Sequence, residues 1–250
     1  MTVVVKLGGS VVTEKDEPET LAEAAIERAA RAVANADEGV VVVHGGGSFG
    51  HHHATRHSVS RTDGTTDATA VREIHGAMKR LNDAMVEALA AAGVPAVPVH
   101  PLSAGTRDAD GDLDLPTEQV RTMLDEGFVP VLHGDVIAHA GAGATIVSGD
   151  ELVVALATGL DADRVGLCSA VPGVLDADDD VIDRIDAFED VAAVLGGSDA
   201  ADVTGGMAAK VRTLLALETP ASIFALTDLD AFFEGDRPGT LVAGGSGNES

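Results

Sequence analysis

The sequence predicts an α/β protein in which helices cover both faces of a mostly parallel central sheet, a three-layer αβα sandwich. Short runs of β-branched and other apolar residues alternate along the chain with longer segments whose apolar residues recur every three or four positions. Continuous apolar runs are typical of strands that are buried on both faces, as in parallel sheets, and the intervening helices supply the crossover connections.

The elements follow one another in a regular order. The short apolar segments predicted as strands are Val3–Leu7, Val40–His44, Val94–Val99, Phe128–Leu132, Ala144–Val147, Arg164–Cys168, Ala221–Ala225 and a last one near Thr240–Val242. The segments predicted as helices from their spacing are Leu21–Ala34, about Asp67 to Ala92, Thr117–Glu126, Asp150–Gly159 and Gly206–Leu217. Ligands bind beyond the carboxyl ends of the strands in such sheets, so we expect the loops after Lys6, Val43, Leu132 and Cys168 to meet at one cleft.

Composition narrows the class of protein. Lys and Arg together number 16 against 41 Asp and Glu, which gives a net charge of −25. This balance argues against nucleic acid or an anionic membrane as a partner, because both need a basic surface. A content of 45% hydrophobic residues predicts a folded chain. Its acidic, strongly hydrated surface predicts a salt-adapted organism, because concentrated salt screens the repulsion between the negative charges. Cys168 is the only cysteine, and the chain enters its first strand without a leader-like segment, so we expect a soluble cytoplasmic protein.

The segment from Val40 to His51, V-V-V-V-H-G-G-G-S-F-G-H, is the strongest functional signal. A buried strand runs directly into glycines whose bare N–H groups can surround an anion, and a following helix would aim its positive end at the same point. His51 lies at the edge of this glycine loop, where its side chain can donate a hydrogen bond. The spacing G-x-G-x-x-G also allows a dinucleotide site, but the next convincing strand begins only at Val94, too far for that motif. Metal binding by three adjacent histidines is disfavoured because neighbours in a helix do not share a face, and we expect His52 and His53 to be solvated.

Lysine is rare in this chain, and three of the four lysines, Lys6, Lys15 and Lys210, lie beside glycine loops. The segment Ser148-Gly149-Asp150 opens a predicted helix and allows two interpretations. Its side chains could cap the helix, or Asp150 could hold two active-site lysines in position. The acidic turns Arg107–Asp114 and Asp176–Asp180 are predicted to be solvated rather than metal-binding.

Taken together, these segments resemble the amino acid kinase family and, within it, the archaeal isopentenyl phosphate kinases. The matching segments, in family order along nearly the whole chain, are K-L-G-G-S at Lys6–Ser10, H-G-G-G-S-F-G-H at His44–His51, P-V-L-H-G-D at Pro130–Asp135, S-G-D at Ser148–Asp150, D-V-T-G-G-M-x-x-K at Asp202–Lys210 and G-T at Gly239–Thr240. The histidine that ends the glycine segment looks specific to isopentenyl phosphate kinases. The chain departs from the family at Ser169–Val174, where T-D-V-D-G-V is usual, and at Leu226-Thr227, where N-G is usual.

The resemblance implies the amino acid kinase fold, with residues 1–160 as the phosphate-acceptor lobe and residues 161–250 as the nucleotide lobe. It implies transfer of the ATP γ-phosphoryl group to isopentenyl phosphate, Mg²⁺ arriving with ATP, and a homodimer. The alternatives are another kinase of this fold, with an amino acid, carbamate or UMP as acceptor, and a non-catalytic nucleotide sensor, which the altered segment Ser169–Val174 would fit. Lys6 and Lys210 would flank the transferred group, Asp150 would position them, Lys15 would hold the ATP phosphates, and His51 would hold the acceptor phosphate.

The implied binding residues extend this set. Those implied for the nucleotide are Lys6, Gly8, Gly9, Ser10, Lys15, Ser169, Gly173, Gly205 and Lys210. Those implied for the acceptor are Gly45, Gly46, Gly47, Gly50, His51, Gly134, Ser148 and Gly149. An apolar stripe on the long helix, formed by Val71, Ile74, Met78, Leu81 and Met85, is expected to be mostly core. One or two of its members nearest the loop, with Met78 and Met85 as the candidates, would limit the length of the acceptor tail.

Overall fold

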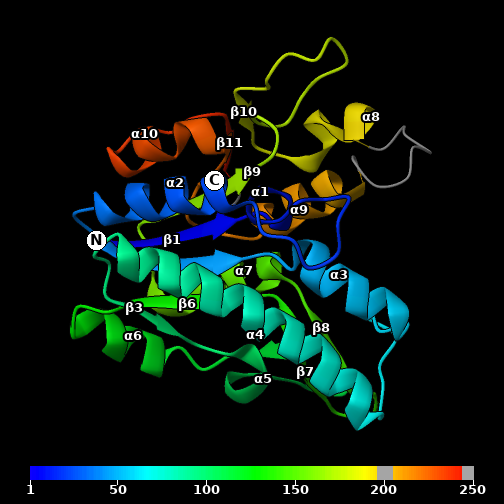
Figure 1. Cartoon of the computed structure of the whole chain (residues 1–250). Coiled ribbons are helices and arrows are strands. Elements are labelled where there is room, and N and C mark those ends of the chain that lie inside the picture. The colour runs from blue at the N-terminus through cyan, green and yellow to red at the C-terminus, as the bar shows by residue number, and fades with distance from the viewer. Residues whose placement is uncertain (196–204, 244–250) are drawn as a thin grey trace.

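The computed structural model describes residues 1–195 and 205–243. The strands of its central sheet are β1 (Thr2–Leu7), β2 (Gly39–His44), β3 (Ala96–Pro98), β6 (Val129–His133), β9 (Arg164–Ser169), β10 (Arg184–Ile185), β11 (Ala221–Ala225) and β12 (Thr240–Val242). They lie in the order β10-β12-β11-β9-β1-β2-β6-β3 (Figure 1). Only β12 pairs antiparallel with a neighbour, β11, so within the described residues the mostly parallel sheet is confirmed.

Helices cover both faces of this sheet. The longer ones are α2 (Glu23–Ala34), α3 (Gly47–Arg56), α4 (Ala68–Ala91), α6 (Glu118–Asp125), α7 (Gly149–Leu160) and α9 (Gly205–Leu215). The shorter ones are α1 (Gly9–Val12), α5 (Pro101–Ala104), α8 (Ala192–Leu195), α10 (Leu229–Phe233) and the 3₁₀ turns η1 (Phe188–Asp190) and η2 (Leu226–Asp228).

Two hydrophobic cores result, because successive side chains of a strand point to opposite faces of the sheet. Val3 and Val5 of β1 pack with α2, α4 and α10, and Val4 packs with α6, α7 and α9. Figure 1 looks onto the face that α4 covers. This three-layer arrangement is the predicted one.

The sequence pattern missed the two-residue edge strand β10 and most of a second sheet. Its strands are β4 (Thr106–Arg107), β5 (Leu113–Asp114), β7 (Asp135–His139) and β8 (Gly143–Val147), in the order β5-β4-β7-β8. The predicted strand Ala144–Val147 therefore exists, but it belongs to this sheet and not to the parallel one. The reason is a tight hairpin: Gly141 and Gly143 both have positive φ and return the chain antiparallel onto β7.

The strand order fixes the position of the expected cleft. Strands β9, β1, β2 and β6 are neighbours and all parallel, so the loops after Cys168, Lys6, Val43 and Leu132 lie along one edge of the sheet, as predicted. The strand predicted at Val94–Val99 is shorter than expected, since Pro95 and Pro98 cannot donate ladder hydrogen bonds. None of the helices in residues 1–195 and 205–243 is long and apolar enough to cross a membrane.

Candidate active site

The loops after β1 and β2 pack against each other backbone to backbone. A Cβ atom on Gly45 would lie 2.6 Å from the nitrogen of Gly9, and one on Gly9 would collide with the backbone of Gly47. The Thr13 hydroxyl ties the loops together: it donates to the Gly9 carbonyl at 2.8 Å and accepts from the Ser48 N–H at 3.0 Å. Glycine is required at these positions because any side chain would separate the two loops.

Free backbone amides converge beside this contact. Gly46 is the N-cap of α3, and among the described residues no hydrogen-bond acceptor faces the N–H groups of Gly46, Gly47 and Gly149. A Cβ atom on the buried Gly134 would lie 3.8 Å from the nitrogen of Gly46 and 3.5 Å from that of Gly149. The first turns of α3 and α7 therefore present unpaired N–H groups to the same small space over Gly134, an arrangement that suits an anion. We call these three amides the amide cradle.

A pair of lysines lies next to the cradle. The Lys6 Nζ donates to the Asp150 Oδ1 at 2.7 Å, and the Lys6 side chain passes close to Gly149. Burial raises the pKa of Asp150, but the charges of Lys6 and Lys210 outweigh burial and hold that pKa below its ordinary value. Burial, together with the charge of Lys6, lowers the pKa of Lys210. The structure thus brings together Lys6, Asp150 and Lys210, as predicted, in a cluster with one positive charge in excess.

The segment Ser148–Asp150 caps its helix, and Asp150 is not the residue that does so. The Ser148 hydroxyl accepts from the Glu151 N–H at 3.2 Å, and the Glu151 carboxylate accepts from the Ser148 N–H at 2.9 Å, which completes a capping box. The helix is therefore capped without Asp150, whose carboxylate is left to bind Lys6.

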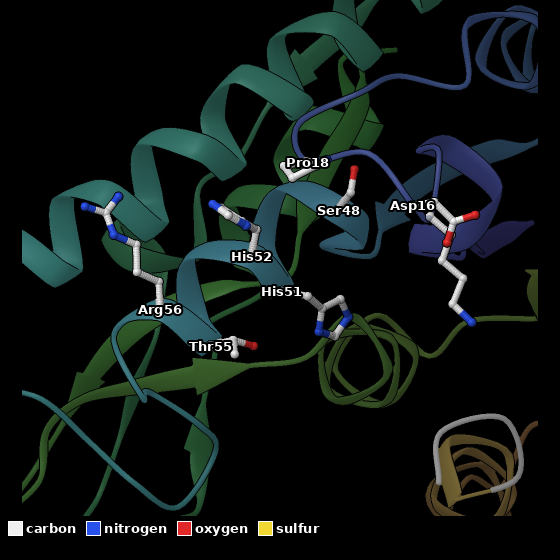
Figure 2. Close-up of a pocket in the computed structure, with 8 residues that line it drawn as sticks. Asp16, Pro18, Ser48, His51, His52, Thr55 and Arg56 are labelled. Atoms are coloured by element: carbon white, nitrogen blue, oxygen red, sulfur yellow. The ribbon is translucent and has the colours of Figure 1, made fainter. Parts of the chain in front are cut away.

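His51 lies at the rim of a cavity of about 460 Å³. The cavity is lined by Lys15, Asp16, Pro18, Ser48, His51, His52, Thr55 and Arg56. Figure 2 shows the rings of His51 and His52 pointing in different directions from the same turn of α3. His51 and Lys15, which lie far apart in the sequence, thus share one concave surface with the N-terminal part of α3, as their predicted roles require.

The prediction that His53 is solvated is wrong. Its side chain is buried, and its Nε2 lies 2.7 Å from the Glu19 Oε1. Arg80 binds the other oxygen of the same carboxylate, at 2.6 Å from Nη2. Glu19 has a φ of +52°, a left-handed conformation that is unusual for glutamate. Glu19 therefore anchors the segment that carries Lys15 to both α3 and α4. A lone glutamate in a polar loop gives no sequence signal for this contact.

A second cavity of about 610 Å³ shares His51 and Thr55 with the first. Its lining consists of His51, Ala54, Thr55, Ser58, Val59, Ser60, Arg61, Asp63 and Ile146. Val59 belongs to a small buried apolar cluster with Ile74, Val136 and Ala144, and Ile146 packs against this cluster. Nothing in the sequence pattern marks Val59 or Ile146 as a site residue.

The apolar stripe of α4 is mostly core, as expected. Leu81 and Met85 are fully buried in the core on the α2 side, and Met78 is buried beneath the glycine loop. A Cβ atom on Gly50 would lie 2.8 Å from the Met78 sulfur, so Gly50 makes room for that side chain.

Several residues that are predicted to bind the nucleotide lie at the ends of β1 and β9 or in the loops that follow them. The Gly8 N–H donates to the Cys168 carbonyl at 2.8 Å, which joins these loops. Ser10 is exposed on α1 and Ser169 ends β9. The buried Gly173 has a packing role, since a Cβ atom there would lie 2.6 Å from the Thr240 hydroxyl, which accepts from the Val174 N–H at 2.7 Å.

The final Gly-Thr pair therefore anchors the loop that departs from the family pattern. Gly205 is the first residue of α9, while the preceding residues of its motif, 202–204, lie outside the described residues.

Arg107 contradicts the prediction of a fully solvated turn. Its guanidinium is buried and donates to the Glu151 carboxylate at 2.6 Å, while the aspartates of the turn are exposed as predicted. Asp176–Asp180 is exposed apart from its first residue, Asp176. Within the described residues no group of three or more acidic, histidine or cysteine side chains is arranged to hold a metal ion.

Comparison with known proteins adds three findings. The sequence model of the amino acid kinase family matches residues 1–220. The chain is 68% identical over 97% of its length to an isopentenyl phosphate kinase of Haloferax volcanii, covering 98% of that protein, and 34% identical over 84% of its length to one of Methanocaldococcus jannaschii, covering 85% of that protein. A crystal structure described as isopentenyl phosphate kinase superposes with a TM-score of 0.82 at 27% identity, over 96% of this chain and 99% of that one.

Proposed function

The chain belongs to the amino acid kinase family and, within it, to the isopentenyl phosphate kinases, and from this premise we propose that it transfers the γ-phosphoryl group of ATP to isopentenyl phosphate. The products would be isopentenyl diphosphate and ADP. The observation that carries the proposal is the position of the amide cradle directly beside Lys6. Two anion-binding groups lie next to each other, as transfer between two phosphates requires.

The acceptor phosphate would bind at the amide cradle and His51. The donors to this phosphate would be the backbone N–H groups of Gly46, Gly47 and Gly149. The side chain of His51, one turn into α3, would donate a further hydrogen bond. An acceptor that is already ionised needs no general base, so orientation of its attacking oxygen is the main task of these groups. Fixed backbone donors perform this task without adding net charge.

The donor phosphates would bind on the other side of Lys6. An oxygen of the acceptor phosphate attacks the γ-phosphorus while the bond to the leaving ADP oxygen breaks, and negative charge spreads over the equatorial oxygens. Lys6 and Lys210 would neutralise these oxygens, held in place by Asp150. Lys15 would contact the remaining ATP phosphates from its segment at the cavity, with Mg²⁺ arriving as part of the ATP substrate.

The isoprenoid tail would enter the cavity bounded by Val59 and Ile146. His51, Val59 and Ile146 line this cavity, and Val59 packs with Ile74 and Val136 in an apolar cluster. Met78 and Met85 are buried beneath the loop and in the core, so we propose that Val59 and Ile146, rather than these methionines, set the tail length.

The remaining features stay predictions. Residues 161–250 would form the nucleotide lobe around β9 and α9, and residues 1–160 the acceptor lobe around α3 and α4. Light scattering in molar KCl would test the homodimer, and cell fractionation would test the cytoplasmic location.

The first test is ADP release by the purified protein in molar KCl with Mg²⁺ and ATP. Isopentenyl phosphate, dimethylallyl phosphate, glutamate, acetylglutamate, carbamate and UMP would serve as acceptors in parallel. Turnover with isopentenyl phosphate, alone or with its isomer, supports the proposal. Turnover only with a carboxylate, carbamate or nucleotide acceptor refutes it.

A matched pair of variants tests the acceptor site. His51→Ala is expected to raise the KM for isopentenyl phosphate by about 10- to 100-fold, the value of a lost hydrogen bond to a charged group. His52→Ala, its neighbour on the same cavity, is the control and leaves this KM unchanged. Equal effects of the two substitutions would contradict a specific role for His51.

A further inference from the structure

Two buried histidines stand directly before the glycine loops. His44 ends β2 and His133 ends β6, and the two residues are register partners in the sheet. Both side chains are fully buried, and their rings stack with centroids 5.6 Å apart. The Nδ1 of each ring lies against the carbonyl oxygen of the following glycine, at 3.1 Å for Gly45 and 3.0 Å for Gly134. The same contact occurs at the ends of two neighbouring strands, which indicates that the two histidines have a common role.

The partners of the other ring nitrogens decide which nitrogen carries the proton. Burial lowers the pKa of His44 to about 4, so its ring is neutral near pH 7 and has one N–H. A carbonyl oxygen can only accept, so the proton must lie on Nδ1 to satisfy Gly45. The Nε2 of His44 lies 3.1 Å from the Asn82 Oδ1, and the nitrogen of the same amide has no hydrogen-bond partner among the described residues. Turning that amide by 180° places its nitrogen opposite Nε2, so that Nε2 accepts while Nδ1 donates.

His133 follows the same logic. Its Nδ1 donates to the Gly134 carbonyl, and its Nε2 accepts from the Nδ1 of His100 at 2.9 Å. Burial lowers the pKa of His133 well below its ordinary value, so it is also neutral. Two neutral donors therefore lie beneath the loops that carry the amide cradle.

The geometry of the peptide group connects His44 to the site. A trans peptide is planar, with its C=O and N–H bonds pointing in opposite directions. The Gly45 carbonyl points at the His44 ring, so the N–H of Gly46, which belongs to the same peptide group, points away from the ring. Glycine has few steric restrictions on its dihedral angles, so this peptide group would rotate readily without a fixed partner.

We propose that His44 is a positioning residue: its Nδ1–H holds the Gly45–Gly46 peptide so that the Gly46 N–H faces the acceptor phosphate. This inference rests on the proposed acceptor site. It gives the buried histidine a task that core packing alone does not require, since an apolar side chain would fill the space but leave the peptide free. His133 supports the Gly134–Asp135 peptide in the same manner.

Two substitutions separate this role from packing. The amide nitrogen of Asn is as many bonds from Cα as the Nδ1 of His, whereas that of Gln matches Nε2. His44→Asn therefore keeps the donor to Gly45, and its KM for isopentenyl phosphate is expected to stay within about threefold of the wild type. His44→Gln loses that donor, and the KM is expected to rise by about tenfold with little change in the KM for ATP. His139→Gln, where the ring is hydrogen-bonded to the Thr145 hydroxyl near the hairpin, is the control and changes neither KM.

Thermal unfolding of each variant controls for damage to the fold. If His44→Asn and His44→Gln change the acceptor KM equally, the inference is overturned while the proposed function stands. The protonated nitrogen is read directly by NMR of wild-type protein labelled with ¹⁵N-histidine. A proton on Nδ1 of His44 supports the inference, and a proton on Nε2 overturns it.

A probe other than the acceptor separates the two proposals. Titration with inorganic phosphate should shift the Gly46 amide resonance in the wild type and in His44→Asn, and much less in His44→Gln. If the wild type fails to act on isopentenyl phosphate, the proposed function falls, but this titration still decides the inference. No shift of Gly46 in the wild type, or the same shift in His44→Gln, overturns it.

Discussion

Replacing Asp150 by asparagine probes the lysine cluster most directly. The substitution keeps the shape of the side chain and removes its charge, leaving Lys6 and Lys210 facing each other without a counter-charge. The Lys6–Asp150 contact is 2.7 Å long, with side chains 10% and 25% exposed. Loss of one partner from a fully buried pair costs about 3–5 kcal/mol, and the partial exposure of Asp150 reduces this to about 2–3 kcal/mol.

The same free energy sets the expected effect on catalysis. If Asp150 fixes Lys6 and Lys210 for the transferred phosphoryl group, about 2–3 kcal/mol of lost transition-state stabilisation lowers kcat by about 30- to 150-fold. The KM for isopentenyl phosphate should change little, because the amide cradle and His51 are left intact. The assay is ADP release at saturating ATP in molar KCl, together with thermal unfolding of the free protein.

Asp161→Asn is the matched control. Asp161 is the C-cap of the same helix, α7, with a φ of +52° that asparagine adopts readily, and its side chain is exposed. This control removes the same charge at the far end of the helix and should leave kcat unchanged. A kcat within about threefold of the wild type for Asp150→Asn would refute the positioning role, whatever the change in stability.

Three further predictions follow from other parts of the molecule. Glu19→Gln weakens the contacts with His53 and Arg80 that anchor the Lys15 segment, so the KM for ATP should rise while the KM for the acceptor stays the same; an unchanged KM for ATP contradicts this. Burial lowers the pKa of His44 from 6.5 to about 4, so the unfolded chain takes up a proton that the folded one refuses, and stability should fall by about 3 kcal/mol as the pH drops from 6.5 towards 4. Denaturant unfolding at several pH values measures this fall, and a flat profile disproves it. With a net charge of −25, the unfolding midpoint should rise between 0.1 M and about 2 M KCl, and a maximum in dilute buffer would contradict the proposed salt adaptation.

Periodicity and glycine placement predicted the strands of the main sheet except the two-residue edge strand β10. The run Val40–His44 is apolar at every position but the last and is a central strand in the structure, buried on both faces. The long stripe of α4 predicted its bounds to within one residue at each end, helped by the Asp67 cap. Because four parallel strands end at the same edge, the location of the site followed from the same pattern.

Contacts between distant polar residues could not be predicted in this way. Glu19 meets His53 and Arg80, partners that are 34 and 61 residues away, and nothing local marks a loop glutamate as an anchor. The hairpin of the second sheet was missed because its strand β7 follows β6 after a single residue, Gly134, which leaves no helix or longer turn to mark a new strand. A local sequence pattern indicates which residues are buried and whether they repeat as in a helix or a strand. The Glu19 contacts and the second sheet depend instead on which segments come together in the fold.

The distribution of charge explains why the site is built largely from backbone amides. A chain with a net charge of −25 repels both substrates, each of them an anion, and exposed lysines would be screened in concentrated salt, where the screening length is about 3 Å at 1 M. Of the four lysines, Lys6 is buried and Lys210 half-buried, and both charges act at the short range where salt intervenes least. The N–H groups of the amide cradle carry no net charge to be screened, and their direction is set by glycine packing and, as we propose, by His44. Such a site would bind phosphates in molar salt by fixed geometry. The acceptor KM of the wild type should therefore depend on salt concentration far less than the acceptor KM of His44→Gln, in which the cradle is no longer held.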